Sequence, residues 1–168
     1  ELVTLLREYQ IDVHFITNAT VLKPEMMEFA VEAGVKDIVV SIDSFTPEGF
    51  DFSRDNRGGK LEKIVENLKL LQRLKAERGS SLPNLRFQAV MMKNNIDEHD
   101  HYVRHAAELG CKKVVLTYLR AVYPQHIEQS LYFMQEESNR KMLDWVWSGM
   151  RHGVDIESVR TFANMHPR

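Results

Sequence analysis

The sequence has only one cysteine, Cys111, among its 168 residues. A single thiol excludes a disulfide within the chain, a CxxC zinc site and the several thiolates that hold an iron–sulfur cluster. The sequence therefore predicts no metal ligands in this chain. Because disulfides belong to oxidising compartments, we expect a reducing compartment and a cytoplasmic protein.

The sequence also lacks long hydrophobic runs and an excess of one charge. No uninterrupted apolar segment approaches the roughly 20 residues that cross a bilayer, and we expect no signal peptide. Lys and Arg number 22 against 24 Asp and Glu, a net charge of -2. This balance offers nucleic acid or an anionic membrane no electrostatic attraction, so we expect neither as a partner.

The remaining composition is that of one globular domain with a buried core. Hydrophobic residues make up 43% of the chain and charged residues 27%, which excludes disordered and low-complexity classes. The hydrophobic period switches repeatedly along the chain, between the spacing of strands and that of helices. It predicts strands at residues 12–17, 37–43, 84–93, 112–120 and from 154, helices at 24–33, 61–74, 97–109 and 136–152, and a long loop at 44–59.

Three strings in the sequence share one design: EAGVKDIVVS, ELGCKKVVLT and RHGVDIESVR each run from a helix end through Gly into a strand. This alternation predicts an α/β fold with parallel strands, for which a (β/α) barrel and an open doubly wound sheet are both possible. No GxGxxG or GxxxxGK[ST] motif follows a strand, so the best-marked nucleotide-binding open sheets are excluded.

The length favours part of a barrel, because a complete eight-unit barrel takes roughly 250 residues. We therefore expect a partial (β/α) TIM-like barrel of parallel strands, truncated at both ends. It would be one domain over residues 1–168. Residues 121–168 would form a trailing helical segment that leads toward a further C-terminal region.

Side-chain alternation separates a polar from an apolar face on each strand. Ser41 and Asp43 share one face of the second strand, and Ile38, Val40 and Ile42 share the other. The apolar set should lie under the helices. Ser41 and Asp43 should then point toward the barrel axis near the carboxyl end of the strand, where barrel enzymes place their chemistry.

The neighbouring strands repeat this division. Arg86, Gln88 and Asn94 fall on one face of the third strand, and Thr117 lies opposite the apolar residues of the fourth. Thr17 and Asn18 end the first strand. Polar groups aimed into a barrel are costly unless paired, so ligand contacts explain them better than core filling does. For Thr17 and Thr117, a hydrogen bond to a neighbouring backbone group is an equal alternative.

Several motifs, taken in order, resemble the middle of radical S-adenosylmethionine (SAM) enzymes. The resemblance runs from about residue 11 to residue 122 and is carried by ITNAT at 16–20, VSIDS at 40–44, RGGKLEKIVENL at 57–68, MMKNN at 91–95 and ELG at 108–110. In that family a TNG-type strand end precedes a vSiDg-type strand and a glycine-rich loop that opens a helix. Residues 128–139 also resemble the segment that precedes a cysteine-rich extension in SPASM-type members.

The resemblance implies a fold and a reaction. The fold is a partial (β/α) barrel with a 4Fe–4S cluster and SAM at the carboxyl edge of its strands. One electron from the cluster cleaves SAM to methionine and a 5′-deoxyadenosyl radical, which abstracts hydrogen from the substrate. The implied partners are a small-molecule or peptide substrate and a reductant such as flavodoxin or ferredoxin.

The resemblance also implies roles for particular residues. Ser41 would contact the amino-acid or ribose part of SAM, and Arg57, or alternatively Arg54, would pair with its carboxylate. Asp43 would order polar contacts, and Gln88 or Arg86 would reach the substrate. The complete implied set is Thr17, Asn18, Ser41, Asp43, Arg54, Arg57, Thr117 and Leu119 for SAM, and Arg86, Gln88 and Asn94 for substrate.

The sequence departs from the family pattern at two places. The cluster motif CxxxCxxC is missing, so we expect the cluster ligands to lie outside this chain and the fragment alone to be inactive. The TNG-type turn reads Asn18-Ala19, and Ala tolerates a positive φ less readily than Gly.

One alternative of a different class stays open: a TIM-like or open-sheet α/β domain that binds a small molecule without redox chemistry. Two further features have simpler explanations. The acidic and histidine residues at 97–105 fit a helix start with surface histidines better than a metal site, and Cys111 fits a small buried thiol better than a nucleophile.

Overall fold

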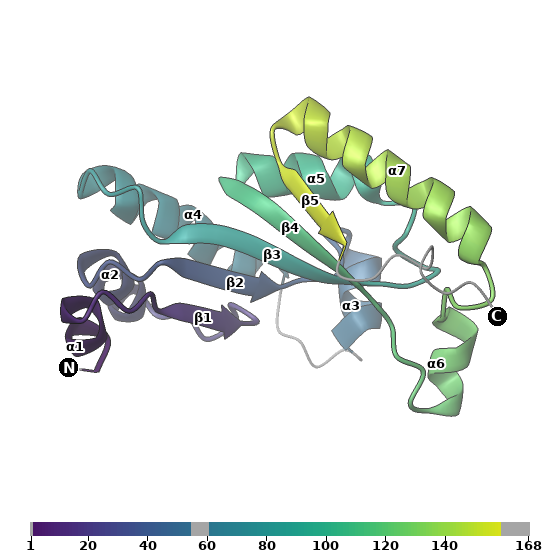
Figure 1. Cartoon of the computed structure of the whole chain (residues 1–168), viewed down its shortest axis with the longest axis horizontal. Coiled ribbons are helices and arrows are strands. Elements are labelled where there is room, and N and C mark those ends of the chain that lie inside the picture. The colour runs from purple at the N-terminus through teal and green to yellow at the C-terminus, as the bar shows by residue number, and fades with distance from the viewer. Residues whose placement is uncertain (1, 55–60, 159–168) are drawn as a thin grey trace.

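The computed structural model describes residues 2–54 and 61–158 (Figure 1). Its centre is a parallel five-stranded sheet whose strands follow the order of the chain, β1-β2-β3-β4-β5. The strands are β1 (His14–Thr17), β2 (Asp37–Ser41), β3 (Asn84–Met91), β4 (Cys111–Tyr118) and β5 (Asp155–Ser158). All strand arrows in Figure 1 point the same way, so their carboxyl ends lie at one edge of the sheet.

One helix precedes β1 in the described part of the chain, and the others connect successive strands. They are α1 (Leu2–Glu8), α2 (Pro24–Glu32), α3 (Pro47–Arg54), α4 (Leu61–Glu77), α5 (His99–Glu108), α6 (Pro124–Gln129) and α7 (Gln135–His152). The predicted alternation of strands and helices is confirmed, including the fifth strand. Figure 1 shows α5 and α7 side by side over β4 and β5, which agrees with the contacts between these elements.

The prediction of a loop over residues 44–59 is wrong, because α3 forms within it. Pro47 stands in the first turn, where its fixed φ suits a helix and its missing N–H costs nothing. The Thr46 hydroxyl accepts a hydrogen bond from the Gly49 N–H at 3.1 Å, which is the geometry of an N-cap. A Thr-Pro-Glu start is therefore a helix signal that outweighs the glycine. The irregular stretch before α7 likewise contains the short helix α6.

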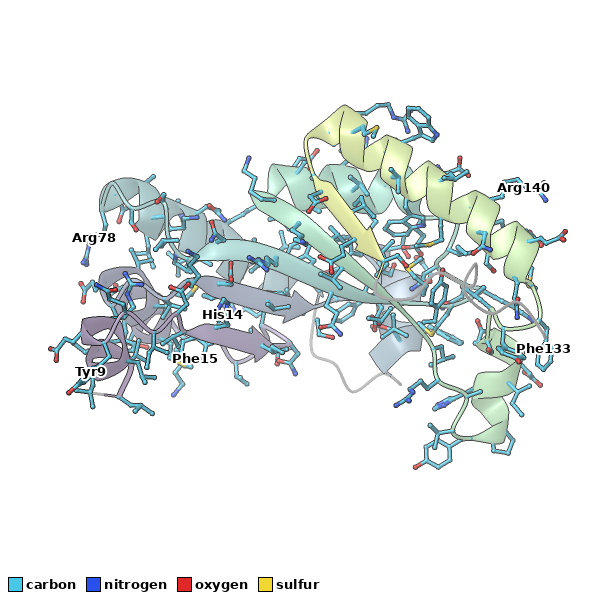
Figure 2. The ribbon with its side chains drawn as sticks, viewed as in Figure 1. Tyr9, His14, Phe15, Arg78, Phe133 and Arg140 are labelled. Atoms are coloured by element: carbon cyan, nitrogen blue, oxygen red, sulfur yellow. The ribbon has the colours of Figure 1, made fainter. Side chains whose placement is uncertain are left out.

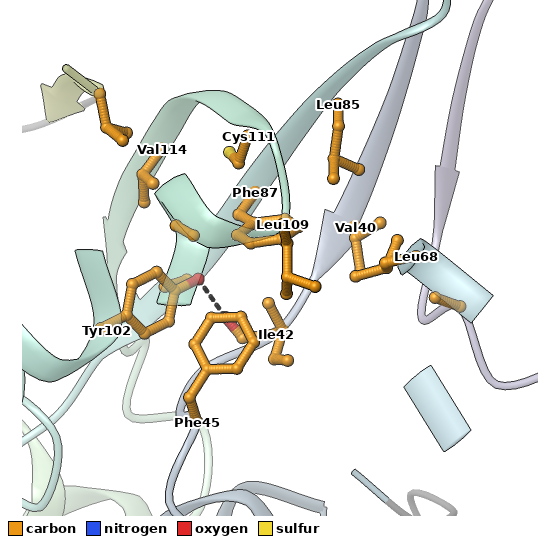
Figure 3. Packing of buried hydrophobic residues seen from close by; sticks show 14 of the residues in the cluster. Val40, Ile42, Phe45, Leu68, Leu85, Phe87, Tyr102, Leu109, Cys111 and Val114 are labelled. Carbon is orange, nitrogen blue, oxygen red and sulfur yellow. Dashed lines mark hydrogen bonds between the residues drawn. The ribbon is translucent and has the colours of Figure 1, made fainter. Parts of the chain in front are cut away.

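The helices cover one face of the sheet, and the core lies between the helices and this face. Val40, Phe87 and Val114 from three neighbouring strands are fully buried, as the strand alternation predicts. They belong to one hydrophobic cluster with Leu68 of α4 and Tyr102 of α5 (Figure 3). Burying each such side chain contributes about 1.5–3 kcal/mol, so this layer is the main source of stability.

Tyr102 shows how the core accommodates a polar group. Its ring is completely buried, and its hydroxyl donates a hydrogen bond to the Ile42 carbonyl at 2.8 Å (Figure 3). Burial raises the pKa of Tyr102 well above its ordinary value. The phenol therefore stays neutral and ties α5 to the carboxyl end of β2.

The opposite face of the sheet is only half-buried. Along β3 the exposure alternates strictly, with Leu85 and Phe87 buried while Arg86, Gln88 and Val90 are intermediate. An open doubly wound sheet reverses its strand order and carries helices on both faces. A sequential order with one covered face is instead the wall of a (β/α) barrel, so the structure decides between the two predicted architectures.

The boundary at residue 121 stays a prediction. The segment that follows it supplies α6, α7 and β5, and β5 pairs with β4 through Val114 opposite Ile156. This part of the trailing segment therefore continues the same sheet.

Helix α7 approaches β5 closely at Gly149. A Cβ atom there would lie 2.5 Å from Ile156 Cγ1 and 2.6 Å from the Val154 carbonyl oxygen. Both distances are shorter than real Cβ contacts, and the carbonyl belongs to the backbone, which cannot move aside cheaply. Glycine is required here by packing.

We predict that Gly149→Ala lowers the free energy of unfolding by about 2 kcal/mol, although Ala is the better helix former, because overpacking outweighs propensity. Urea denaturation followed by circular dichroism measures this change. Asp144→Ala, on the exposed side of the same helix, is the control and should stay within about 0.5 kcal/mol of the parent. Equal stability of the two variants would contradict the close approach.

Candidate functional site

Polar side chains from neighbouring strands meet on the uncovered face near the carboxyl edge of the sheet. Ser41 of β2 pairs in register with Gln88 of β3, and Thr117 of β4 pairs with Val90, two residues farther along β3. Paired residues of adjacent strands point to the same side of a sheet. Three predicted residues, Ser41, Gln88 and Thr117, thus lie on one face, away from the helices.

Thr117 and Gln88 differ in their existing contacts. The Thr117 hydroxyl donates to the Ala89 carbonyl at 3.3 Å, so it partly serves the backbone. The Gln88 amide makes no side-chain hydrogen bond with residues 2–54 or 61–158, although it is half-buried. An amide without such a bond on an uncovered face is available to a ligand.

Asp43 lies two residues beyond the end of β2, so the strand alternation does not extend to it. Its carboxylate Oδ1 accepts a hydrogen bond from the Val90 N–H at 2.8 Å, and the residue is 8% exposed. Asp43 therefore joins the carboxyl ends of β2 and β3. Its predicted role in ordering polar contacts stays a prediction.

Asn95 completes this junction, and sequence reasoning missed it. Its side-chain amide donates to the Asp43 carbonyl at 3.0 Å and to the Val90 carbonyl at 2.8 Å, and its Oδ1 accepts from the Met92 N–H at 2.8 Å. The residue is 1% exposed. One buried amide thus satisfies three backbone groups of two strand ends.

Asn94, the predicted substrate residue beside it, is exposed in the turn after β3. The prediction that it shares a face with Arg86 and Gln88 is wrong, because β3 ends at Met91 and the alternation stops there. A contact between Asn94 and a substrate stays a prediction.

Arg86 lies on the uncovered face but toward the amino end of the strands. Its Nε donates to Asp37 Oδ1 at 2.9 Å, and Asn84 Nδ2 donates to the same oxygen at 3.1 Å. Asp37 Oδ2 lies 2.5 Å from Nδ1 of His14, which is labelled on β1 in Figure 2. Oδ1 of the fully buried Asp37 thus accepts from two side chains, so the Arg86 guanidinium is partly engaged before any substrate arrives.

Lys113, the register partner of Arg86 on β4, is neutralised in the same way. Its Nζ lies 2.5 Å from a Glu157 oxygen and 3.4 Å from an Asp155 oxygen. The hydrogen bond to Glu157 raises the pKa of Lys113. The amino half of the uncovered face therefore carries paired charges.

The turn after β1 contains a residue with a positive φ. Ala19 adopts φ 58°, in the left-handed region where the TNG-type turn has Gly. The Thr17 Oγ1 accepts from the Ala19 N–H at 3.0 Å, and buried Asn67 of α4 donates to the Ala19 carbonyl at 3.0 Å. One local and one tertiary hydrogen bond thus hold Ala19 in a conformation that its own preference opposes.

Thr17 and Asn18 are both used locally in this turn. The register places Thr17 opposite Val40, on the helix-covered side, and Asn18 Oδ1 accepts from the Thr20 N–H at 3.1 Å and from its hydroxyl at 2.7 Å. Their ligand roles stay predictions.

The other predicted SAM residues lie near the same edge or outside the described parts of the chain. The Leu119 N–H donates to the Met91 carbonyl at 3.3 Å just after β4 ends. Arg54 is the last residue of α3, and its side chain is not described. Arg57 lies outside the described residues.

The fit of a 4Fe–4S cluster can be tested on Cys111. This thiol is 1% exposed, pairs in register with Leu85 on the helix-covered face, and donates to the Lys113 carbonyl at 3.1 Å. Burial raises its pKa to about 12. Within the described part of the chain no three His, Cys, Asp or Glu side chains are grouped to hold a metal, so these residues do not fit a cluster.

We predict that Asn95→Ala lowers the free energy of unfolding by about 3 kcal/mol, because it leaves buried backbone groups of both strand ends unpaired. Chemical denaturation measures the loss. Asn94→Ala is the matched neighbour control and should change stability by less than about 0.5 kcal/mol. Similar values for the two variants would contradict the junction.

We predict that Cys111 in the folded protein resists Ellman's reagent at pH 9.5 and reacts within minutes in denaturant. A pKa of about 12 keeps the native thiol protonated there, whereas an exposed thiol with the ordinary value of 9.0 is largely thiolate. The raised pKa contributes stability that is present below pH 9 and is lost as the pH rises toward 12. Rapid native labelling would contradict the buried placement.

In the described ranges no helix combines the length and apolar character needed to cross a membrane. No curated protein sequence matches this chain.

Solved structures share its fold. The SAM-bound structure of Streptococcus suis SuiB has a TM-score of 0.71 at 14% identity and covers 98% of this chain and 37% of that one. SuiB bound to precursor peptide SuiA has a TM-score of 0.69 at 14% identity, covering 95% and 34%. AnSMEcpe with bound AdoMet and Cp18Cys peptide has a TM-score of 0.65 at 16% identity, covering 94% and 44%.

The chain thus spans less than half the length of these proteins. The sequence profile of the radical SAM superfamily matches residues 1–85, which is half of the chain and includes β1, β2 and the turn at Ala19. The predicted resemblance is confirmed: this chain belongs to the radical SAM superfamily.

Proposed function

We propose that this chain forms the SAM-binding wall of a radical SAM enzyme whose 4Fe–4S cluster is held by cysteines outside these 168 residues. The observation that carries the proposal is the pairing of Ser41 with Gln88 on the uncovered face, next to the carboxyl edge of a parallel sheet. Membership of the superfamily and the fold shared with SAM-bound SuiB support it. When bound, the cluster and SAM together supply reductive cleavage of SAM and hydrogen abstraction from the substrate.

The residues of this chain would bind and orient SAM. The Ser41 hydroxyl can both donate and accept, so it suits the amino-acid or ribose part. Arg54 or Arg57 would meet the SAM carboxylate, since a guanidinium binds a carboxylate through two parallel hydrogen bonds. Asn18, in the turn after β1, would border SAM at the carboxyl edge, and Thr17, on the helix-covered side, would hold this turn in place. Thr117 and Leu119 would flank the adenine on the β4 side. Asp43 would hold the strand ends in place beneath it.

The Gln88 amide would serve the substrate or SAM, and it has both a donor and an acceptor to offer. Arg86 and Asn94 would contact substrate at the two ends of this region. For Arg86, the hydrogen bond to Asp37 leaves only part of the guanidinium available.

We propose a peptide as the substrate class. SuiB is solved with its precursor peptide and anSMEcpe with the Cp18Cys peptide, and both share this fold. Within the described residues, Arg86 and Lys113 are both paired with carboxylates, which suits a neutral polypeptide backbone better than a phosphorylated metabolite. The reductant would be a flavodoxin- or ferredoxin-type protein.

The amino-acid change that tests SAM binding is Ser41→Ala. We predict that it weakens SAM binding about tenfold, the loss expected for one good hydrogen bond. The measurement is SAM affinity and 5′-deoxyadenosine formation with dithionite, in the anaerobically reconstituted full chain that carries its cluster cysteines. Ser81→Ala is the control, because Ser81 is exposed and lies just before the amino end of β3, away from the proposed site.

Residues 1–168, reconstituted alone with iron and sulfide, should develop no stable 4Fe–4S absorbance, because they hold a single cysteine. Such an absorbance would contradict the proposal that the cluster ligands lie outside these residues. A full-length gene without a cysteine triplet, or SAM binding without cleavage, would instead favour a non-redox small-molecule-binding domain.

A further inference from the structure

We propose that Glu98 is a positioning residue for the SAM-binding edge, an inference that rests on the proposed function. Glu98 stands immediately before α5, in the loop that leaves β3. It acts on the segment from Ser44 to Gly49, which connects β2 with α3 and follows Asp43 directly.

Both carboxylate oxygens of Glu98 are engaged by this segment. Ser44 Oγ donates to Oε2 at 2.5 Å, and Thr46 Oγ1 donates to Oε1 at 3.1 Å. Ser44 is fully buried. Hydrogen bonds to an ionised acceptor are the stronger kind, so a residue 54 positions away in sequence holds this turn by two of them.

The hydroxyls that bind Glu98 also accept hydrogen bonds from the backbone. The Thr46 N–H donates to Ser44 Oγ at 3.0 Å, and the Gly49 N–H donates to Thr46 Oγ1 at 3.1 Å. The two hydroxyls also lie 2.9 Å from each other. With its proton on Glu98, each hydroxyl turns its lone pairs toward the backbone N–H groups, so the carboxylate orients both. Without the carboxylate, each hydroxyl would keep only the other as a side-chain partner among the described residues.

Glycine at position 49 allows this arrangement. A Cβ atom there would overlap Ser44 Oγ and lie 2.8 Å from Glu98 Oε1. The first turn of α3 can approach the carboxylate only because that space is empty. The cluster of Ser44, Thr46, Gly49 and Glu98 is therefore a built contact between two loops.

The contact fixes the path of the chain between β2 and α3, and this segment leads toward the proposed SAM residues. The Phe50 N–H donates to the Thr46 carbonyl at 2.9 Å, and the Phe50 ring is 1% exposed, so α3 is anchored where the turn ends. Helix α3 then leads to Arg54. At its other end the turn continues from Asp43, which Asn95 of the same β3–α5 loop holds. One loop thus fixes both the end of β2 and the start of α3.

The test compares Glu98→Gln with Glu108→Gln, which changes the exposed glutamate that ends α5. The full reconstituted chain is studied by hydrogen–deuterium exchange and by SAM titration. In Glu98→Gln we expect the amides of Thr46 and Gly49 to exchange about tenfold faster or more, with β3 amides unchanged, and SAM affinity to fall about tenfold. Glu108→Gln should match the parent in both.

Ser44→Ala removes one of the two hydrogen bonds to Glu98 without changing a charge, and the bond from Thr46 remains. It should speed exchange at Thr46, whose N–H loses its acceptor, and lower SAM affinity in the same direction, and it replaces Glu98→Gln if that variant fails to fold. Unchanged exchange at Thr46 and Gly49, or unchanged SAM affinity in variants of a parent that binds SAM, overturns the role of Glu98 alone. A reconstituted parent that binds no SAM overturns the proposed function and this inference together.

Discussion

Burial of one face of the sheet beneath α4 and α5 is the constraint on which the rest of the structure depends. Val40, Phe87 and Val114 have no exposed surface, and moving any strand by one residue would bring polar neighbours into the core in their place. The same constraint determines which residues lie on the other face. Ser41 and Gln88 lie beside each other on that face because the apolar residues next to them along each strand pack against the helices.

A second set of contacts fixes the backbone at the carboxyl edge of the sheet. Strand ends leave backbone groups without partners, and here buried side chains satisfy them. Asn95 and Asp43 join β2 to β3, and Glu98 holds the turn that follows. Asn67 likewise donates to the Ala19 carbonyl, which satisfies a backbone group of the left-handed turn after β1. The edge that would receive SAM is therefore shaped by residues that need not touch it.

The sequence predicted the features that depend on period and order. Alternation placed Ser41, Gln88 and Thr117 correctly on one face, and glycines marked the helix ends, as the left-handed Gly34, Gly110 and Gly153 show. It could not distinguish Asn95 from Asn94, since which of two adjacent asparagines turns inward depends on the strand end that meets it. Glu98 was invisible for a similar reason: its partners lie more than 50 positions away.

The single cysteine is buried in the apolar layer beneath the helices. Under the proposed function, this chain would therefore serve the reaction by holding SAM and substrate, and the cluster ligands would lie outside it. A crystal structure of the reconstituted full chain with SAM tests most directly whether SAM lies on the uncovered face at the carboxyl edge. We expect density for SAM against Ser41 and Gln88. Density for SAM at the amino end near Asp37, or on the helix-covered side, would contradict this placement.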